Sequence, residues 1–188
     1  MRPENVAVAE FLRAHAPFAL HMSLHGMALG EGAMLLIERH WIDRTEVLRD
    51  GFAEAVAATG LGLHDHDRKG EKGFRYIGPG FTTTPEGKAM RAYFHARHDE
   101  ATALLFHQSS MEFVRGLGGD PLCLVTELPL FVVANDEPEP GVPGAYLRAR
   151  RHLAEGGDPG GIDVRSLPLR IGIELQLTAL RLGLAAVS

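Results

Sequence analysis

The stretch that decides the fold is residues 18–26, Phe18-Ala19-Leu20-His21-Met22-Ser23-Leu24-His25-Gly26. Its apolar side chains alternate strictly with small or polar ones, and a period of two predicts a β-strand with one buried face. The strand is expected to end at His25 and Gly26. A histidine at the carboxyl end of a strand lies where open α/β sheets bind their ligands.

A second strand is predicted at residues 122–126, because Leu122-Cys123-Leu124-Val125-Thr126 is almost entirely apolar, as in a strand covered on both faces. Glu127 follows it, and burying an unpaired carboxylate is costly, so Glu127 needs a partner or a function. A histidine ligand and a glutamate base suit zinc-dependent hydrolysis, because the metal acidifies a water whose proton the carboxylate accepts. The alternative is a hydrogen-bonded histidine and a salt-bridged glutamate, both purely structural.

Helical and strand patterns alternate along the rest of the chain. Helices are expected at about residues 6–14, 43–59, 84–98, 100–106, 145–155 and 166–186, and further strands at 33–37 and 111–114. Residues 60–84, rich in glycine and charge, are predicted to form a long functional loop. The alternation predicts an α/β fold with a mixed, mostly parallel sheet flanked by helices.

Composition limits the possible functions. The 188 residues, 45% apolar and 23% charged, fit one soluble domain or a substantial part of a larger one. A net charge of -5 argues against a nucleic-acid or acidic-membrane partner. The single cysteine, Cys123, excludes an intrachain disulfide and a multi-cysteine zinc site. The sequence shows no membrane span and no signal core, so we expect a cytoplasmic protein. Ten histidines indicate metal or proton chemistry.

Four segments, in order, resemble landmarks of zinc metallocarboxypeptidases of the carboxypeptidase A type. They are residues 3–12, Leu20–Gly26, Ser109–Phe113 and Leu124–Leu128. The resemblance covers about residues 3–133 and implies a carboxypeptidase-like fold, one zinc ion, and a peptide or small amide substrate. It implies that His25 is a zinc ligand, that Glu127 is the catalytic residue activating the zinc-bound water, and that Glu112 lines the substrate-binding pocket. Residues from about 144 to 188 are expected to form a C-terminal helical extension.

The sequence also lacks several features of that family. Its first two zinc ligands come from an upstream His-x-x-Glu motif, and no such motif precedes His25. The family's Asn-Arg pair for the substrate carboxylate, and a tyrosine before the acidic position, are missing too. We therefore expect an incomplete domain, the C-terminal half of a catalytic domain. Its zinc would require ligands from a missing N-terminal segment or subunit. The alternative is a non-catalytic peptide- or partner-binding module derived from the same fold.

Three further groups have residue types that bind metals: His152 with Glu155, His64–Asp67, and His95 with His98. The first matches His-x-x-Glu by letter, but it lies after the catalytic glutamate on a helix expected to be exposed. The second group lies in the long loop, where we expect it to face the substrate or to be merely polar. The third shares one face of a predicted helix, an arrangement that is more often a solvated polar face.

Overall fold

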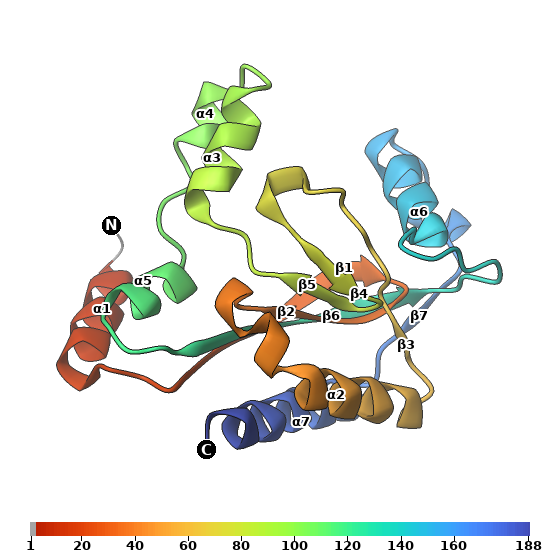
Figure 1. Cartoon of the computed structure of the whole chain (residues 1–188). Helices are drawn as coiled ribbons and strands as arrows, with labels where there is room; N and C mark the ends of the chain where they lie inside the picture. The colour runs from red at the N-terminus through yellow and green to blue at the C-terminus, as the bar shows by residue number, and fades with distance from the viewer. Residues whose placement is uncertain (1–2) are drawn as a thin grey trace.

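The computed structural model describes residues 3–188. The α-helices within them are α1 (Pro3–His15), α2 (Glu46–Ala58), α3 (Gly87–His95), α4 (Glu100–Ala103), α5 (Ser110–Gly116), α6 (Gly144–Ala154) and α7 (Leu169–Val187). The strands are β1 (Leu20–Gly30), β2 (Gly32–Ile37), β3 (Gly62–Leu63), β4 (Tyr76–Gly78), β5 (Phe81–Thr83), β6 (Leu122–Val133) and β7 (Val164–Ser166). Helices lie on both sides of one sheet (Figure 1).

The sheet has the strand order β1-β6-β2-β5-β4, with β3 beside β2 and β7 beside β6. Strand β1 runs parallel to β6, and β2 runs parallel to both β3 and β5. Strand β6 is antiparallel to β2 and β7, and β4 is antiparallel to β5. The two longest strands, β1 and β6, are therefore direct neighbours, although about half of the chain separates them in sequence.

The main core lies between the sheet and the pair α2 and α7, on what we call the α7 face. Helix α2 buries Leu48, Phe52 and Val56 there, at the spacing of one helix face. Helix α7 packs closely at Gly183, where a Cβ atom would lie 3.0 Å from Leu124 Cδ1 and 3.2 Å from Leu20 Cδ1. A small residue at that position lets the helix approach the two long strands.

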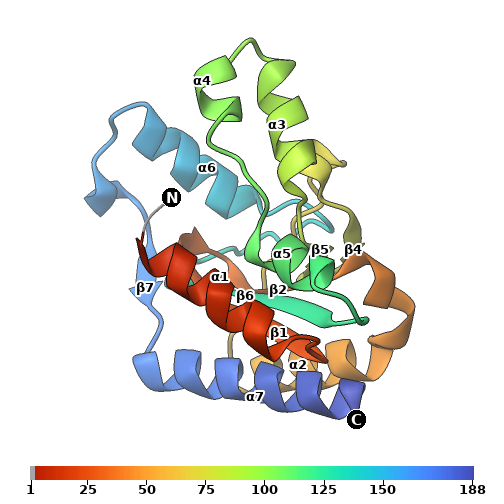
Figure 2. The ribbon, with the colours of Figure 1, turned by 90° about the vertical axis from the view of Figure 1, so that its left-hand side faces the viewer.

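The opposite face of the sheet, which we call the α5 face, lies below α3, α4, α5 and α6 (Figures 1 and 2). Its buried apolar residues form two separate clusters instead of one continuous core. One cluster joins Phe74 to Met34, Leu36 and Val125. The other packs Val133 against Ala145 and Ala149 of α6. Polar side chains of β1 and β6 thus have room between the two clusters.

The predicted α/β fold, a mixed sheet flanked by helices, is confirmed. "Mostly parallel" is too strong, because half of the six strand pairings in residues 3–188 are antiparallel. The C-terminal segment is not purely helical, since β7 pairs with β6. Between residues 3 and 188 no helix is long and apolar enough to cross a bilayer.

The predictions for residues 111–114 and for the end of β6 were wrong. Residues 111–114 form part of helix α5, which begins with a capping box between Ser109 and Glu112. Strand β6 does not stop at Glu127 but continues through Pro129. Proline is tolerated there because β6 has left β2 after Glu127 and joins β7 only at Phe131, so that one side of the strand is unpaired at Pro129.

Candidate functional site

His25 and Glu127 lie side by side on the α5 face of the sheet. They are direct register partners in the parallel pair β1 and β6, and His25 Nδ1 lies 3.6 Å from Glu127 Oε1. Both residues were predicted to lie at strand ends. That prediction was wrong, because β1 continues to Gly30 and β6 to Val133, so the pair lies in the middle of two long strands.

The two side chains differ in exposure, and this difference sets their chemistry. The His25 side chain is 57% exposed, whereas the Glu127 side chain is 22% exposed. Burial raises the pKa of Glu127 above that of an ordinary glutamate, although His25 and Arg68 act in the opposite direction. A half-buried carboxylate with a raised pKa takes up a proton more readily than a solvated one, as a general base must.

Arg68 is the residue near this pair that the sequence analysis missed. Its guanidinium carbon lies 4.2 Å from the centre of the Phe74 ring, and Phe74 packs on Met34 and Val125. Met34 is the register partner of Glu127 in the adjacent strand β2. The positive charge of Arg68 is therefore held above the sheet close to Glu127, where it favours the ionised carboxylate.

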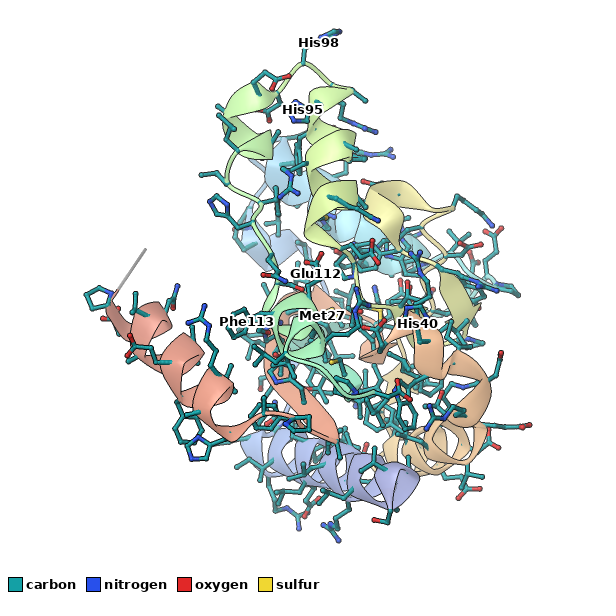
Figure 3. All side chains as sticks on the ribbon, turned by 60° about the vertical axis from the view of Figure 1, so that its left-hand side comes forward. Met27, His40, His95, His98, Glu112 and Phe113 are labelled. Carbon is teal, nitrogen blue, oxygen red and sulfur yellow. The ribbon has the colours of Figure 1, made fainter. Side chains whose placement is uncertain are left out.

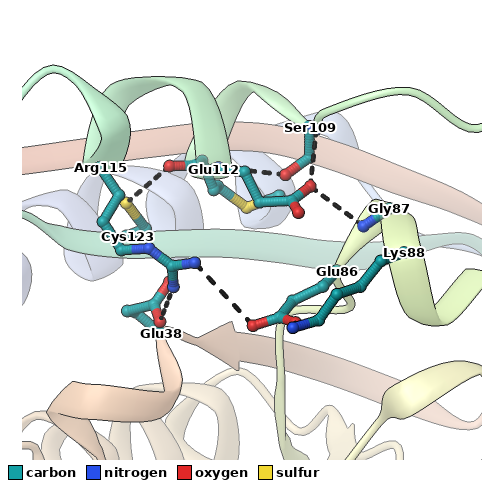
Figure 4. Close-up of polar contacts among 9 residues, drawn as sticks. Glu38, Glu86, Gly87, Lys88, Ser109, Glu112, Arg115 and Cys123 are labelled. Atoms are coloured by element: carbon teal, nitrogen blue, oxygen red, sulfur yellow. Dashed lines mark hydrogen bonds and ion pairs between the residues drawn. The ribbon is translucent and has the colours of Figure 1, made fainter.

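Glu112 lies at the start of α5 (Figure 4). Its Oε2 accepts hydrogen bonds from the backbone N–H groups of Ser109, at 2.8 Å, and Gly87, at 3.0 Å. Burial alone would raise the pKa of this carboxyl, but these bonds and nearby Arg115 outweigh it, so the pKa is lowered. One oxygen of Glu112 thus ties the start of α5 to the start of α3.

Arg115 connects the same region to the sheet. Its guanidinium Nη1 donates to Glu38 Oε1 at 2.6 Å, and Glu38 is almost fully buried at the end of β2. Cys123 lies beside this pair, and burial raises the pKa of its thiol to about 12. The thiol is therefore protonated at neutral pH, and neither it nor Arg115 is free for chemistry (Figure 4).

His21, and the histidines of the metal-binding groups predicted near α3 and α6, lie in different parts of the fold. His21 shares the face of His25, and its Nε2 lies 3.1 Å from Ser110 Oγ. His95 and His98 lie at the far end of α3, away from Glu112 and Met27 (Figure 3). Helix α3 ends at His95, so His98 lies beyond it and the two do not share a helix face. His152 lies on exposed α6 with its Nε2 bonded to the carbonyl oxygen of Asp158, at 2.9 Å.

His64 in the loop after β3 has a structural environment. It is 1% exposed, and its Nδ1 accepts a hydrogen bond from the backbone N–H of Glu31 at 3.2 Å. Burial, followed by the charges of His66 and Arg68, lowers the pKa of His64 to about 4. The ring is thus neutral at physiological pH, and it packs edge-on against Tyr146 of α6.

Among residues 3–188, His25 and Glu127 are not joined by a third metal-binding side chain. Catalytic zinc takes three protein ligands, and among residues 3–188 no three His, Cys, Asp or Glu side chains lie close enough together to hold a metal ion. His25 next to Glu127 offers one imidazole and one carboxylate. The residues present therefore fit part of such a site and not the whole.

Comparison of the chain with protein-family models, with curated proteins and with solved structures finds no match. The carboxypeptidase resemblance therefore depends on the four short segments themselves, residues 3–12 and those around His25, Glu112 and Glu127.

Proposed function

We propose that this chain supplies half of the active site of a metallocarboxypeptidase-like hydrolase, with His25 as one zinc ligand and Glu127 as the catalytic base. The observation that carries the proposal is the pairing of His25 with Glu127 at 3.6 Å across two neighbouring strands. The remaining zinc ligands would come from a polypeptide segment or subunit that carries a His-x-x-Glu motif. The substrate would be a peptide or a small amide.

Glu127 can perform the proton transfers of amide hydrolysis. A water attacks the scissile carbonyl carbon and gives its proton to the Glu127 carboxylate. The C–N bond then breaks, and Glu127 passes that proton to the leaving amine. A raised pKa makes the Glu127 carboxylate a stronger base for the first transfer, and the leaving amine, which is far more basic than any carboxylate, takes the proton in the second.

Glu112 is the proposed specificity residue. Its Oε2 is held by two backbone N–H groups, which leaves Oε1 for a substrate group. Because its pKa is lowered, Glu112 is ionised at neutral pH and would favour a basic side chain. Arg68 would add a positive charge close to Glu127.

The second candidate function is a non-catalytic peptide- or partner-binding module. The incomplete donor set favours it, since among residues 3–188 no complete metal site is present. The two functions differ in one respect that can be tested. The hydrolase must shorten a peptide once its zinc ligands are supplied, whereas the module binds the peptide and leaves it intact.

We expect a single, monomeric copy of this chain to bind zinc weakly, with a Kd above about 1 µM, because one imidazole and water make a poor site. Titration calorimetry with Zn²⁺ on the wild type and on His25→Ala measures this. His98→Ala is the matched control, because His98 is also exposed but lies beyond α3, far from Glu112. Sub-micromolar affinity that disappears in His25→Ala would mean that this chain completes the site, contrary to the proposal.

A further inference from the structure

Strand β1 has an open edge that lacks the usual protection against pairing. Among residues 3–188 its only neighbour is β6. The β1 sequence, residues 20–30, contains no lysine, arginine, aspartate, glutamate or proline. Natural edge strands carry such residues to prevent association, and a long unprotected edge is a template for another strand.

An apolar stripe on α7 lies next to this edge. It consists of Ile173, Leu177, Leu180 and Leu184, whose exposure ranges from 37% to 50%. The opposite side of the helix buries Leu175, Ala179 and Gly183. Helix α7 is thus apolar on both sides, as in a helix that is covered on both. In Figure 2, α7 lies in front of α2, and the four side chains of the stripe are exposed.

From these surfaces we infer that a second copy of this chain docks here, with β1 against β1 and α7 against α7 about a two-fold axis. The spacing of the stripe is symmetric, since steps of four, three and four residues read the same in both directions. Two antiparallel copies therefore match Ile173 with Leu184 and Leu177 with Leu180. A self-complementary surface is what an isologous two-fold interface requires.

Strand β1 is symmetric in the same way about Ser23. Met22 would face the partner's Leu24 on the α7 face, and His21 would face the partner's His25 on the α5 face. Leu122 N–H donates to the carbonyl oxygen of Ala19, so odd-numbered residues of β1 direct their backbone groups towards β6. The even-numbered residues direct theirs towards the open edge, where an antiparallel partner would pair with them.

The two centres of symmetry coincide along the molecule. Near its C-terminal end α7 lies against the start of β1, where Gly183 is next to Leu20. Near its N-terminal end α7 lies by the end of β6, where Ile171 and Val132 line the same cavity. Helix α7 therefore runs opposite to β1. From the level of Leu20, the centre of the stripe is about 7 Å away, and Ser23 is about 10 Å away in the same direction. The centre of the stripe on α7 and Ser23 of β1 therefore lie within about one strand residue of each other along the strands, so a single two-fold axis can pass through both.

Charge and area also fit a second copy. Glu174 and Arg181 lie on the same flank of the stripe, so the antiparallel arrangement sets each Glu174 within one turn of the partner's Arg181. The face formed by β1 and α7 together is about 30 Å long. Its depth, one sheet layer plus one helix layer, is about 20 Å, so its area is about 600 Å² per copy. That value approaches the roughly 800 Å² per partner of a standard specific interface.

Analytical ultracentrifugation of the wild type at about 50 µM should give twice the monomer mass. Leu177→Glu on α7 and Leu24→Lys on β1 should each raise the dimer dissociation constant at least about tenfold, because each places a charge in the apolar interface. Val47→Glu is the control, since Val47 is 82% exposed on α2, outside this face. Circular dichroism must show that every variant is folded. A monomeric wild type, or a dimer that both variants leave unchanged, would overturn the inference.

Ser23→Cys tests the axis itself. Residues opposite each other at a non-hydrogen-bonded antiparallel pair have Cα atoms about 4.5 Å apart, within the range for a disulfide. The only native cysteine, Cys123, is buried. Under mild oxidation Ser23→Cys should therefore run as a covalent dimer on a non-reducing gel, and Val47→Cys should not. Failure of Ser23→Cys to cross-link, or equal cross-linking of both variants, would contradict the two-fold axis.

Discussion

Replacing Glu127 by glutamine should lower turnover by about two or more orders of magnitude in the active assembly, by which we mean this chain together with a polypeptide that supplies the His-x-x-Glu motif. Glutamine keeps the shape of the side chain but cannot accept the proton of the attacking water, and losing a positioned general base typically costs this much. Rates of amino-acid release from a peptide, measured for wild type and Glu127→Gln, give the ratio directly.

The zinc content of Glu127→Gln should stay near that of the wild type, because the proposal makes Glu127 a base and not a ligand. The variant should also fold. Burial raises the pKa of Glu127, so its ionised form is less favourable in the folded than in the unfolded chain, and this cost grows as the pH rises through the raised pKa. Removing that charge should not lower the free energy of unfolding at pH 7. Glu54→Gln, at an exposed position on α2, is the matched control. A fully active Glu127→Gln enzyme would refute the proposed mechanism.

Replacing His25 by alanine should lower zinc affinity and activity together. In the proposed site the change removes a ligand bound directly to the metal, so the affinity should fall by at least about 100-fold, and the activity should fall with it. Metal analysis after dialysis and peptide-cleavage rates on the same samples measure both. The contrast with Glu127→Gln, which should lose activity alone, separates the two roles. A His25→Ala assembly that keeps a full complement of zinc would show that the ligand assignment is wrong.

The long strands could be predicted because their signals are local. The alternation before His25 and the apolar run before Glu127 each mark a strand without knowledge of the rest of the chain. The short strands in residues 60–84 could not be found in this way. Strands β3, β4 and β5 have two or three residues each, too few to show a period, and they exist because they pair with β2 or with each other.

Helix α5 was missed although the sequence carries its signal. Met111-Glu112-Phe113-Val114 suggests a strand by its apolar residues, but Ser109 and Glu112 have the spacing of a capping box, which marks a helix start. No local signal identifies Arg68. Its place near Glu127 depends on Phe74 packing against Met34 and Val125, and these contacts arise only when the sheet is assembled.

The most direct test of the central claim is mass spectrometry of a peptide incubated with the active assembly and Zn²⁺. Two versions of one peptide should be compared, one with a free C-terminal carboxylate and one with a C-terminal amide. The account predicts that the free peptide loses its last residue, that the amidated peptide is not shortened, and that Glu127→Gln suppresses the reaction. An intact free peptide, or cleavage that does not depend on Glu127, would contradict the claim that His25 and Glu127 form half of a carboxypeptidase-like site.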